Sequence, residues 1–335
     1  MHMADALISP AVGGTAWAAT AGLISYSSRK LRDGMDDRQI PLMAVLGAFI
    51  FAAQMVNFTI PATGSSGHLG GGLILAILLG PYAGFLTLAS VLIIQALFFA
   101  DGGLLALGCN ILNLGFFQCF VAYPFLYRKM VGDHQRKWLI VTGAMIAAIA
   151  GLQLGSLAVV TQTTLSGISE LPFRTFVLIM QPIHLAIGLV EGAATVAVIL
   201  FVLKARPEIL KEPVGEAEGV KSFSIRNLAV GFLIAALVAG GGFSWFSSKY
   251  PDGLEWSVLR VTGTNGVREP EGGVHRSLAD IQEKTAILPD YGLEKNNKRE
   301  EDDKGAPLSG LVGGLLTMLF AGIVWLLLKR RRVRI

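Results

Sequence analysis

Long apolar stretches separated by short polar segments follow one another along most of the chain. A transmembrane helix needs about 20 mostly apolar residues, and we identify nine candidate spans by this pattern. They are residues 10–27, 42–58, 69–80, 82–99, 103–127, 138–160, 174–203, 227–246 and 308–328. The third and fourth are short and are divided only by Gly80 and Pro81. The pattern predicts an all-α integral membrane protein.

Composition argues against the alternative, a large soluble protein with an unusually apolar core. Hydrophobic residues make up 53% of the 335 residues and charged residues only 16%, and the mean hydropathy is +0.57. The chain also contains 40 glycines. Glycine is commoner in transmembrane helices than in soluble ones, because it allows neighbouring helices to approach closely.

The basic residues mark one side of the membrane. Lysine and arginine gather in the segments 29–38, 128–137, 204–226 and 329–334. If the spans alternate, these segments share one side, which the positive-inside rule identifies as the cytoplasm. The N-terminus is then outside and the C-terminus inside a bacterial cell membrane, and the pI of about 9.1 reflects topology rather than a nucleic-acid partner. Nothing basic precedes Arg29, so we do not expect the first span to be a cleaved signal peptide.

A charged segment divides the spans into two groups. We expect a seven-helix bundle over residues 1–203, a cytoplasmic linker over 204–226, and a two-helix hairpin over 227–335 that carries a small outer domain in the loop 247–306. That loop contains Pro251-Asp252-Gly253-Leu254-Glu255 and later Pro289-Asp290-Tyr291-Gly292-Leu293-Glu294. The two segments read either as a weak repeat of one motif or as two ordinary turns.

The two cysteines, Cys109 and Cys119, fall in one apolar segment. Ten residues along a helix correspond to roughly 15 Å of rise, which excludes a disulfide or a shared metal within that helix. We interpret both as small buried packing residues.

Met1 and His2 can form a chelating arc of three nitrogens. The free amine of Met1, the backbone nitrogen of His2 and a ring nitrogen of His2 close a five-membered and a six-membered ring on one ion. Ni(II) and Cu(II) favour such square-planar nitrogen ligation, whereas Zn(II) prefers a tetrahedron. We expect Met1 to be retained, since methionine is normally removed only before a small residue.

A planar site needs a fourth donor, and we select His68 for it. His134 lies in a basic cytoplasmic segment, His184 within the seventh expected span and His275 in the outer loop. His68 lies on the expected outer side, in the glycine-rich segment 63–72, which can bend and approach another backbone closely. From these residues alone, a chance Met-His start and a solvated loop histidine remain an open alternative.

Several motifs carry a resemblance to a known family. They are Met1-His2-Met3-Ala4-Asp5-Ala6-Leu7, Ser65-Ser66-Gly67-His68 with Leu78-Leu79-Gly80-Pro81, Gln95 to Leu104 with Leu107-Gly108-Cys109-Asn110, and His184 to Gly192. Residues 1–203 thereby resemble the CbiM/NikM substrate-binding subunits of cobalt and nickel energy-coupling-factor transporters. Residues 227–328, with the segment 251–255, are similar to the small partner subunit of these systems, here fused to the first.

The resemblance implies a ligand set, partners and a cargo. The Met1 amine, the amide and ring of His2, and the ring of His68 would bind the transported ion. A membrane-embedded coupling subunit and two ATP-binding-cassette ATPase subunits would drive uptake. Cobalt members commonly have Ile-x-Asp/Glu-Gly after Met-His; the Met3-Ala4-Asp5-Ala6 found here, together with the fused hairpin, resembles the nickel type. We therefore expect Ni²⁺ first and Co²⁺ second.

Other residues have a functional and a structural interpretation. Asp5 can orient a ligand or mark the start of a helix, and Asn57, Thr63, Ser65 and Ser66 can hydrogen-bond the imidazoles or line a polar turn. The small residues Gly14, Ala18 and Gly22 suit either docking of the coupling subunit or internal packing. His184 and Glu191 lie in an expected span, where ionisable residues tend to be functional. For this pair, hydrogen bonding between helices or contact with a coupling subunit is favoured over a second metal site.

The sequence excludes some functions and leaves others as alternatives. It has no Gly-x-x-x-x-Gly-Lys-Ser/Thr loop for ATP and no nucleophile–base arrangement, so we expect no enzymatic activity. The rivals are a substrate-binding subunit for an organic vitamin, which would need an aromatic-rich pocket, a non-transport membrane interaction protein, and a secondary permease coupled through Glu191. Because amine and imidazole donors must lose protons before they bind metal, we predict that capture fails at pH 5.

Overall fold

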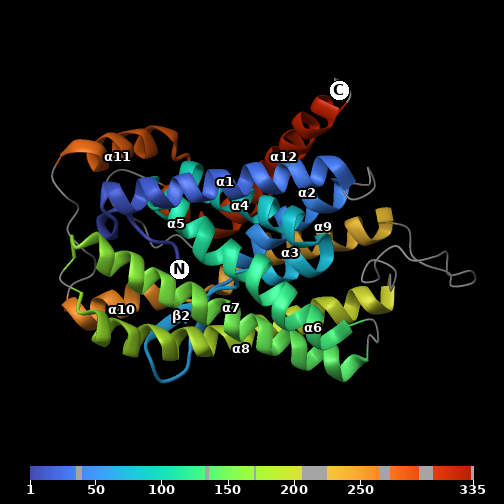
Figure 1. Ribbon diagram of the computed structural model, residues 1–335, viewed down its shortest axis with the longest axis horizontal. Coiled ribbons are helices and arrows are strands. Elements are labelled where there is room, and N and C mark those ends of the chain that lie inside the picture. Colours follow the sequence, from blue (N-terminus) through green and yellow to red (C-terminus); the bar gives the residue numbers. More distant parts are fainter. Residues whose placement is uncertain are drawn as a thin grey trace, which may run out of the picture.

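The chain is almost entirely helical in the computed structural model (Figure 1), which describes residues 1–34, 40–132, 136–169, 171–205, 225–263, 272–293 and 305–332. The N-terminal part contains η1 (Asp5–Leu7), α1 (Pro10–Gly34), α2 (Ile40–Gln54), β1 (Phe58–Ile60), β2 (Ser65–Gly67), α3 (Gly72–Leu79) and α4 (Pro81–Phe99). It continues through α5 (Leu107–Ile111), the π-helical η3 (Leu112–Tyr127) and α6 (Arg128–Val131), which together form one rod, to α7 (Lys137–Ser166) and α8 (Phe173–Ala205). Most of the segment 204–226, His134 and Glu294 lie outside the described residues.

The C-terminal part is a hairpin of two long helices with a helical insert. It comprises α9 (Ile225–Gly241), η6 (Phe243–Phe246), α10 (Gly253–Thr262), α11 (Gly273–Thr285), η7 (Pro289–Tyr291) and α12 (Gly305–Arg332). We call the described insert, residues 247–263 and 272–293, the cap. The helices α9 and α12 pack closely, because a Cβ on Gly310 would lie 2.6 Å from the Gly240 oxygen. The helix α12 also packs closely against α2, because a Cβ on Gly313 would lie 1.9 Å from Cζ of Phe51.

Six helices in the described part of the chain are long and apolar enough to cross a membrane. They are Pro81–Phe99, Leu107–Val131, Lys137–Ser166, Phe173–Ala205, Arg226–Phe246 and Gly305–Val324. The protein is therefore a multi-pass membrane protein, but three expected spans differ from the simple pattern. The helix α1 is long but not apolar enough, the apolar part of α2 covers only Pro41–Gln54, and α3 has eight residues.

The expected span 69–80 is only partly helical. The antiparallel hairpin β1–β2 leads into an extended segment before α3 begins at Gly72. At Gly80, with φ of 82°, the chain turns directly into α4, and a Cβ on Gly84 would lie 2.8 Å from the Ala76 backbone nitrogen. Irregular backbone at membrane depth is tolerated only where protein surrounds it, and α3 is fully buried.

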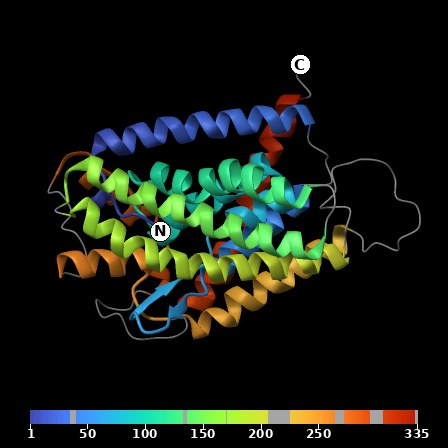
Figure 2. The same cartoon turned by 60° about the horizontal axis from the view of Figure 1, so that its bottom comes forward.

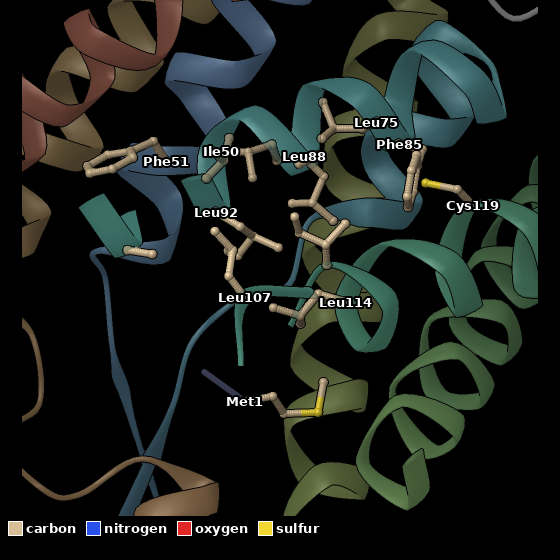
Figure 3. Packing of buried hydrophobic residues seen from close by; sticks show 14 of the residues in the cluster. Met1, Ile50, Phe51, Leu75, Phe85, Leu88, Leu92, Leu107, Leu114 and Cys119 are labelled. Atoms are coloured by element: carbon tan, nitrogen blue, oxygen red, sulfur yellow. The ribbon is translucent and has the colours of Figure 1, made fainter. Parts of the chain in front are cut away.

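The first residues of the chain lie inside the molecule. Both views place the N-terminus among the helices, while α1 runs along one side of the bundle and the cap lies at one end (Figures 1 and 2). Met1 belongs to the main apolar cluster, together with residues such as Leu107 and Leu114 (Figure 3). The burial of the Met1 side chain in this cluster therefore holds the N-terminus inside the bundle.

Candidate metal centre

The N-terminal segment is held by backbone contacts to the loop and helix that follow α4. Met3 is fully buried, its N–H donates to Asn110 Oδ1 at 2.8 Å, and Asn110 Nδ2 donates to the Met3 carbonyl at 3.2 Å. The Gly103 N–H donates to the same carbonyl at 2.9 Å. These bonds fix the position of Met3 inside the bundle.

Asp5 supports this segment rather than an imidazole. Its Oδ1 accepts a hydrogen bond from the Ala106 N–H at 2.9 Å, and burial raises the pKa of its carboxyl group. A Cβ on Gly103 would lie 1.9 Å from Asp5 Oδ1, so only glycine fits beside it. Asp5 and His2 line one cavity, but the hydrogen bond of Asp5 goes to the loop.

The structure brings His2 and His68 together. Their rings are stacked, with centroids 5.1 Å apart and planes inclined by 16°. His2 Nδ1 lies 3.0 Å from Asp101 Oδ1, and His2 Nε2 is buried without a hydrogen-bond partner. His68 Nδ1 lies 3.0 Å from the Leu69 carbonyl, which makes Nε2 the ring nitrogen that remains for a ligand.

The Met1 amine contacts a carboxylate from the C-terminal part of the chain. It donates to Asp252 Oδ2 at 3.3 Å, and the Met1 and Asp252 side chains are 3% and 17% exposed. Asp252 is also the N-cap of α10, where its Oδ1 accepts the N–H groups of Leu254 and Glu255 at 2.8 Å each. The Asp252 N–H in turn donates to Glu255 Oε2 at 3.2 Å, which completes a capping box.

The hairpin before His68 is bound to the cap. The Ser66 N–H donates to the Pro251 carbonyl and its hydroxyl to the Tyr250 carbonyl, each at 2.8 Å. Trp256 Nε1 donates to the Thr63 carbonyl at 3.0 Å. This segment of the sequence therefore positions the cap against the histidine loop.

The polar residues expected to support the imidazoles make other contacts. The Thr63 and Ser65 hydroxyls bond each other at 2.7 Å. The backbone N–H of Asn57 donates to Ser247 Oγ of the cap at 2.8 Å. For Thr63, Ser65 and Ser66 these contacts fit the interpretation as a polar turn, while the Asn57 side chain lines the same cavity as His2 and His68, so a supporting role for it stays a prediction.

The second Pro-Asp turn of the cap reaches His2 through an intermediate. The Tyr291 hydroxyl donates to Asp101 Oδ2, while Asp101 Oδ1 faces His2. The Tyr291 ring stacks on Phe99 with centroids 5.1 Å apart. Burial acts to raise the pKa of Asp101, but the charge and hydrogen bond of His2 and the hydrogen bond from Tyr291 together lower it to about 2.

Burial and charge also act on the other groups of the site. Burial lowers the pKa of the His68 imidazole to about 4, and the positive Met1 amine acts in the same direction. Burial acts to raise the pKa of Asp252, but the Met1 amine, His68 and the backbone N–H of Glu255 together lower it well below its usual range. The site therefore combines a neutral imidazole with two ionised carboxylates.

Glu191 binds the backbone of the segment that follows His68. Its Oε2 accepts the Gly70 N–H at 2.7 Å, and its Oε1 accepts the Gly71 N–H at 3.0 Å and Gln118 Nε2 at 3.1 Å. These bonds satisfy the backbone donors of the extended segment before α3. His184 bonds the Met180 carbonyl of its own helix at 2.8 Å. The expected hydrogen bonding between segments of the bundle is found for Glu191, whereas the bond of His184 stays within α8.

A cavity of about 690 Å³ opens beside the two histidines. Its lining includes His2, His68, Asp101, Asp252, Glu255 and Tyr291, with further polar residues of the cap. Most of these side chains are polar or charged, unlike the aromatic-rich lining that an organic vitamin would need. The cavity gives the site a polar approach from the end of the bundle that the cap covers.

Two further expectations concern residues away from the site. Gly14, Ala18 and Gly22 on α1 are exposed, and a Cβ on Gly14 or Gly22 would meet nothing within 4 Å. Internal packing therefore does not explain this stripe. Cys109 and Cys119 are free and buried, as expected of packing residues.

Sequence reasoning overlooked the two carboxylates of the site. Asp101 lies inside a motif that carried the family resemblance, yet it received no role. Asp252 was noted only as part of a turn motif, because the contact with Met1 joins residues 251 positions apart. The presence of similar Pro-Asp turns on the expected outer side was the one available signal.

Family models match both parts of the chain. Residues 2–209 match the CbiM model, described as the cobalt uptake substrate-specific transmembrane region. Residues 226–330 match the PDGLE domain. Together they cover most of the sequence, in the order expected for a substrate-binding part followed by a small-subunit part.

Relatives and solved structures agree with these matches. A putative fused nickel transport protein NikMN from Archaeoglobus fulgidus is 32% identical over 73% of this chain and 79% of its own length. A probable fused nickel transport protein LarMN from Lactiplantibacillus plantarum is 29% identical over 98% of this chain and 97% of its own. A crystal structure of a truncated transition metal transporter is 30% identical, with a TM-score of 0.54 over 61% of this chain and 99% of that one.

Proposed function

Because the chain belongs to the CbiM family of transmembrane proteins for metal uptake, joined to a PDGLE domain, we propose that it captures Ni²⁺ at the outer membrane face for ATP-driven uptake. It is a transport protein and not an enzyme. Co²⁺ is the second candidate. The ion is bound by the Met1 amine, the His2 amide and ring, and the His68 ring.

The position of the two imidazoles is the observation that carries this proposal. With metal–nitrogen bonds of about 2 Å, two rings on one ion have centroids between roughly 4.5 Å (neighbouring positions) and 6 Å (opposite positions). The rings of His2 and His68 lie 5.1 Å apart. His2 Nε2 has no hydrogen-bond partner among the described residues, so the ring is not held at this nitrogen.

Closing the six-membered chelate ring requires Nδ1 of His2. In the structure this nitrogen faces Asp101. Ligation through the full arc therefore requires the His2 ring to turn away from Asp101, after which the carboxylate is no longer opposite Nδ1. The site is consequently a set of donors that lie close together and complete their geometry on the ion.

Side chains alone do not form this site. Among the residues that the structure describes, no group of three or more His, Cys, Asp or Glu side chains could hold a metal ion. The proposed site has two side-chain donors and takes its other two from the chain start. A terminal amine and an amide nitrogen favour an ion that accepts planar nitrogen ligation, as Ni(II) does.

The remaining parts of the proposal rest on the family and its relatives. The names of the fused relatives refer to nickel, whereas a 28% identical relative from Geobacter sulfurreducens is named cobalt transport protein CbiM. We place the cap outside and the C-terminus in the cytoplasm, following the positive-inside rule. A coupling membrane subunit and two ATPase subunits supply the energy, and the exposed stripe Gly14, Ala18 and Gly22 is a docking face for the coupling subunit.

A measurement of bound metal tests the ligand set. The full chain with its native start is purified in detergent and compared with a form extended by one residue ahead of Met1 and with His68→Ala. We expect the native form to bind Ni²⁺ and both variants to lose at least about 100-fold in affinity, because each lacks one of four donors and donor-supporting groups alone are worth roughly 10–100-fold.

The variants also separate the alternatives. Equal Ni²⁺ binding by all three forms would contradict the proposed site. Loss in the extended form alone would remove His68 from the ligand set. A control, His275→Ala, alters a cap histidine that bonds the Ile8 carbonyl at 2.9 Å, and we expect it to bind Ni²⁺ with its affinity changed far less than in the other two.

A further inference from the structure

The first Pro-Asp turn of the cap places a carboxylate on the amine that the proposed function uses as a donor. Asp252 Oδ2 lies 3.3 Å from the Met1 nitrogen. Asp252 comes from the PDGLE domain, whereas Met1, His2 and His68 come from the first part of the chain or directly precede it. Among the contacts between the two fused parts, this ion pair lies beside the imidazoles.

This carboxylate is rigidly held. Its other oxygen caps α10 with two N–H bonds of 2.8 Å, and the turn itself is fixed by the Ser66 bonds to Tyr250 and Pro251. A Cβ on Gly253 would lie 2.7 Å from Ile183 Cγ2. The turn therefore packs against α8 without space to move.

The contact is compatible with metal binding. An amine that has lost one proton to become a donor keeps two N–H bonds, and one of these can still be donated to Asp252 Oδ2. Carboxylates that accept the remaining N–H of a metal ligand orient it and raise its basicity. Among the residues that the structure describes, the hydrogen-bond partner of the Met1 nitrogen is this carboxylate, so the direction of the amine in the cavity depends on Asp252.

We propose that Asp252 of the PDGLE domain is a positioning residue for the Met1 amine, so that this domain completes the metal site of the first part of the chain. Asp252 acts through the amine and does not bind the ion itself. This inference rests on the proposed function, because it assigns a role to Asp252 at the same site. It makes the cap part of the binding step.

The substitution Asp252→Asn tests this role with little damage to the fold. Asparagine is as good an N-cap as aspartate, so the cap of α10 is retained and only the negative partner of the amine is lost. With Ni²⁺ alone as the probe, we expect an affinity about 10–100-fold lower than that of the native chain. The matched control Asp280→Asn removes the same charge from an exposed position on α11 and is expected to leave the affinity unchanged.

A double-variant comparison distinguishes positioning from general support of the fold. Asp252→Asn is combined with the form extended by one residue ahead of Met1, in which the terminal amine is displaced. If Asp252 acts through that amine, the second change adds no further loss, whereas independent effects add. Cu²⁺ serves as a second probe, because it binds nitrogen donors more tightly and keeps weak binding measurable.

The outcomes separate this inference from the proposed function. Loss of Ni²⁺ in His68→Ala together with unchanged binding in Asp252→Asn would overturn the role of Asp252 and leave the metal site intact. A loss that is additive in the extended form would also overturn it. Unchanged binding in both His68→Ala and the extended form would instead contradict the proposed function.

Discussion

The two Pro-Asp turns of the cap are similar in sequence but differ in how they contact the chain start. In the first, Asp252 has an extended backbone and starts a regular helix with a complete capping box. In the second, Asp290 and Tyr291 have φ angles of 48° and 60° and belong to the three-residue 3₁₀ helix η7. The first reaches the Met1 amine directly, and the second reaches His2 only through Asp101.

The difference shows that a turn motif alone does not define a contact. A left-handed backbone is unfavourable for residues other than glycine, and it directs the Tyr291 side chain, rather than the Asp290 carboxylate, towards Asp101. A capped helix instead holds Asp252 in one place. The same kind of segment therefore provides a charged partner in one case and a neutral hydrogen-bond donor in the other.

A matched pair of glycine substitutions should give the largest difference between the turns. In Gly253→Ala the new methyl group meets Ile183 at 2.7 Å and His184 at 3.3 Å, so the turn cannot pack and Asp252 leaves the amine. We expect Ni²⁺ affinity to fall by about 10–100-fold and the free energy of unfolding by about 1–3 kcal/mol, measured by metal titration and thermal unfolding in detergent.

The partner substitution Gly292→Ala should have little effect. Its nearest neighbour would be the Pro289 oxygen at 3.6 Å, an ordinary contact, and its φ of −98° suits any residue. If Gly292→Ala weakened Ni²⁺ binding as much as Gly253→Ala, the two turns would be equally important and the comparison would fail.

A serine pair tests how the first turn is held against the histidine loop. Ser66→Ala leaves the Tyr250 carbonyl without its 2.8 Å bond, which costs about 1 kcal/mol and corresponds to a loss of Ni²⁺ affinity of up to about tenfold. Ser65→Ala serves as the control, because the Ser65 hydroxyl bonds only within its own loop. Equal affinities of the two variants would indicate that the backbone bond from Ser66 is sufficient.

The helical architecture and the chain-start site could be predicted because both are local in sequence. Apolar stretches of spanning length identify the long helices α4, α7 and α8, and the adjacency of Met1 and His2 defines a chelating arc without knowledge of the fold. The pairing of His2 with His68, which the structure shows, needed only the assumption that they share one side of the membrane.

The rest depended on contacts between distant segments. The span 69–80 looked like a short helix, because sequence cannot show that Glu191 satisfies the N–H groups of Gly70 and Gly71 and so permits an extended segment at this depth. For Asp5 the sequence left two roles open, orienting a ligand or starting a helix, and could not show that its carboxylate accepts the Ala106 N–H, 101 residues away. Polar residues were the least predictable, since their partners are set by packing.

The second turn should give a smaller effect of opposite sign. Tyr291→Phe removes the hydroxyl that holds Asp101, and Asp101 in turn faces the His2 nitrogen that the chelate requires. Weakening a contact that the ion must displace favours binding. We expect Ni²⁺ affinity to rise a few-fold, since a hydrogen bond contributes about 0.5–1.5 kcal/mol. A fall in affinity would instead show that Asp101 stays with His2 when the ion is bound.

The smallest expected effect is the pH dependence of the free energy of unfolding, in which His68 and the two carboxylates behave differently. For Asp252 and Asp101 the pKa in the folded protein is lowered, so their stabilising contribution is complete above the unfolded pKa of about 4 and is lost only as the pH falls through the lower folded value. The contacts of both turns should therefore persist at pH 5, the pH at which metal capture is predicted to fail.

His68 behaves differently because its lowered pKa belongs to a base. Between the unfolded value of about 6.5 and the folded value of about 4, the unfolded chain binds the extra proton, so stability decreases as the pH falls through this window. One proton changes the free energy by at most about 1.4 kcal/mol per pH unit, which corresponds to a decrease of a few degrees in Tm. Thermal unfolding of the native chain and of His68→Gln between pH 7 and 4.5 should show a steeper decrease in the native chain. Equal slopes in both proteins would mean that His68 is not buried as a neutral base.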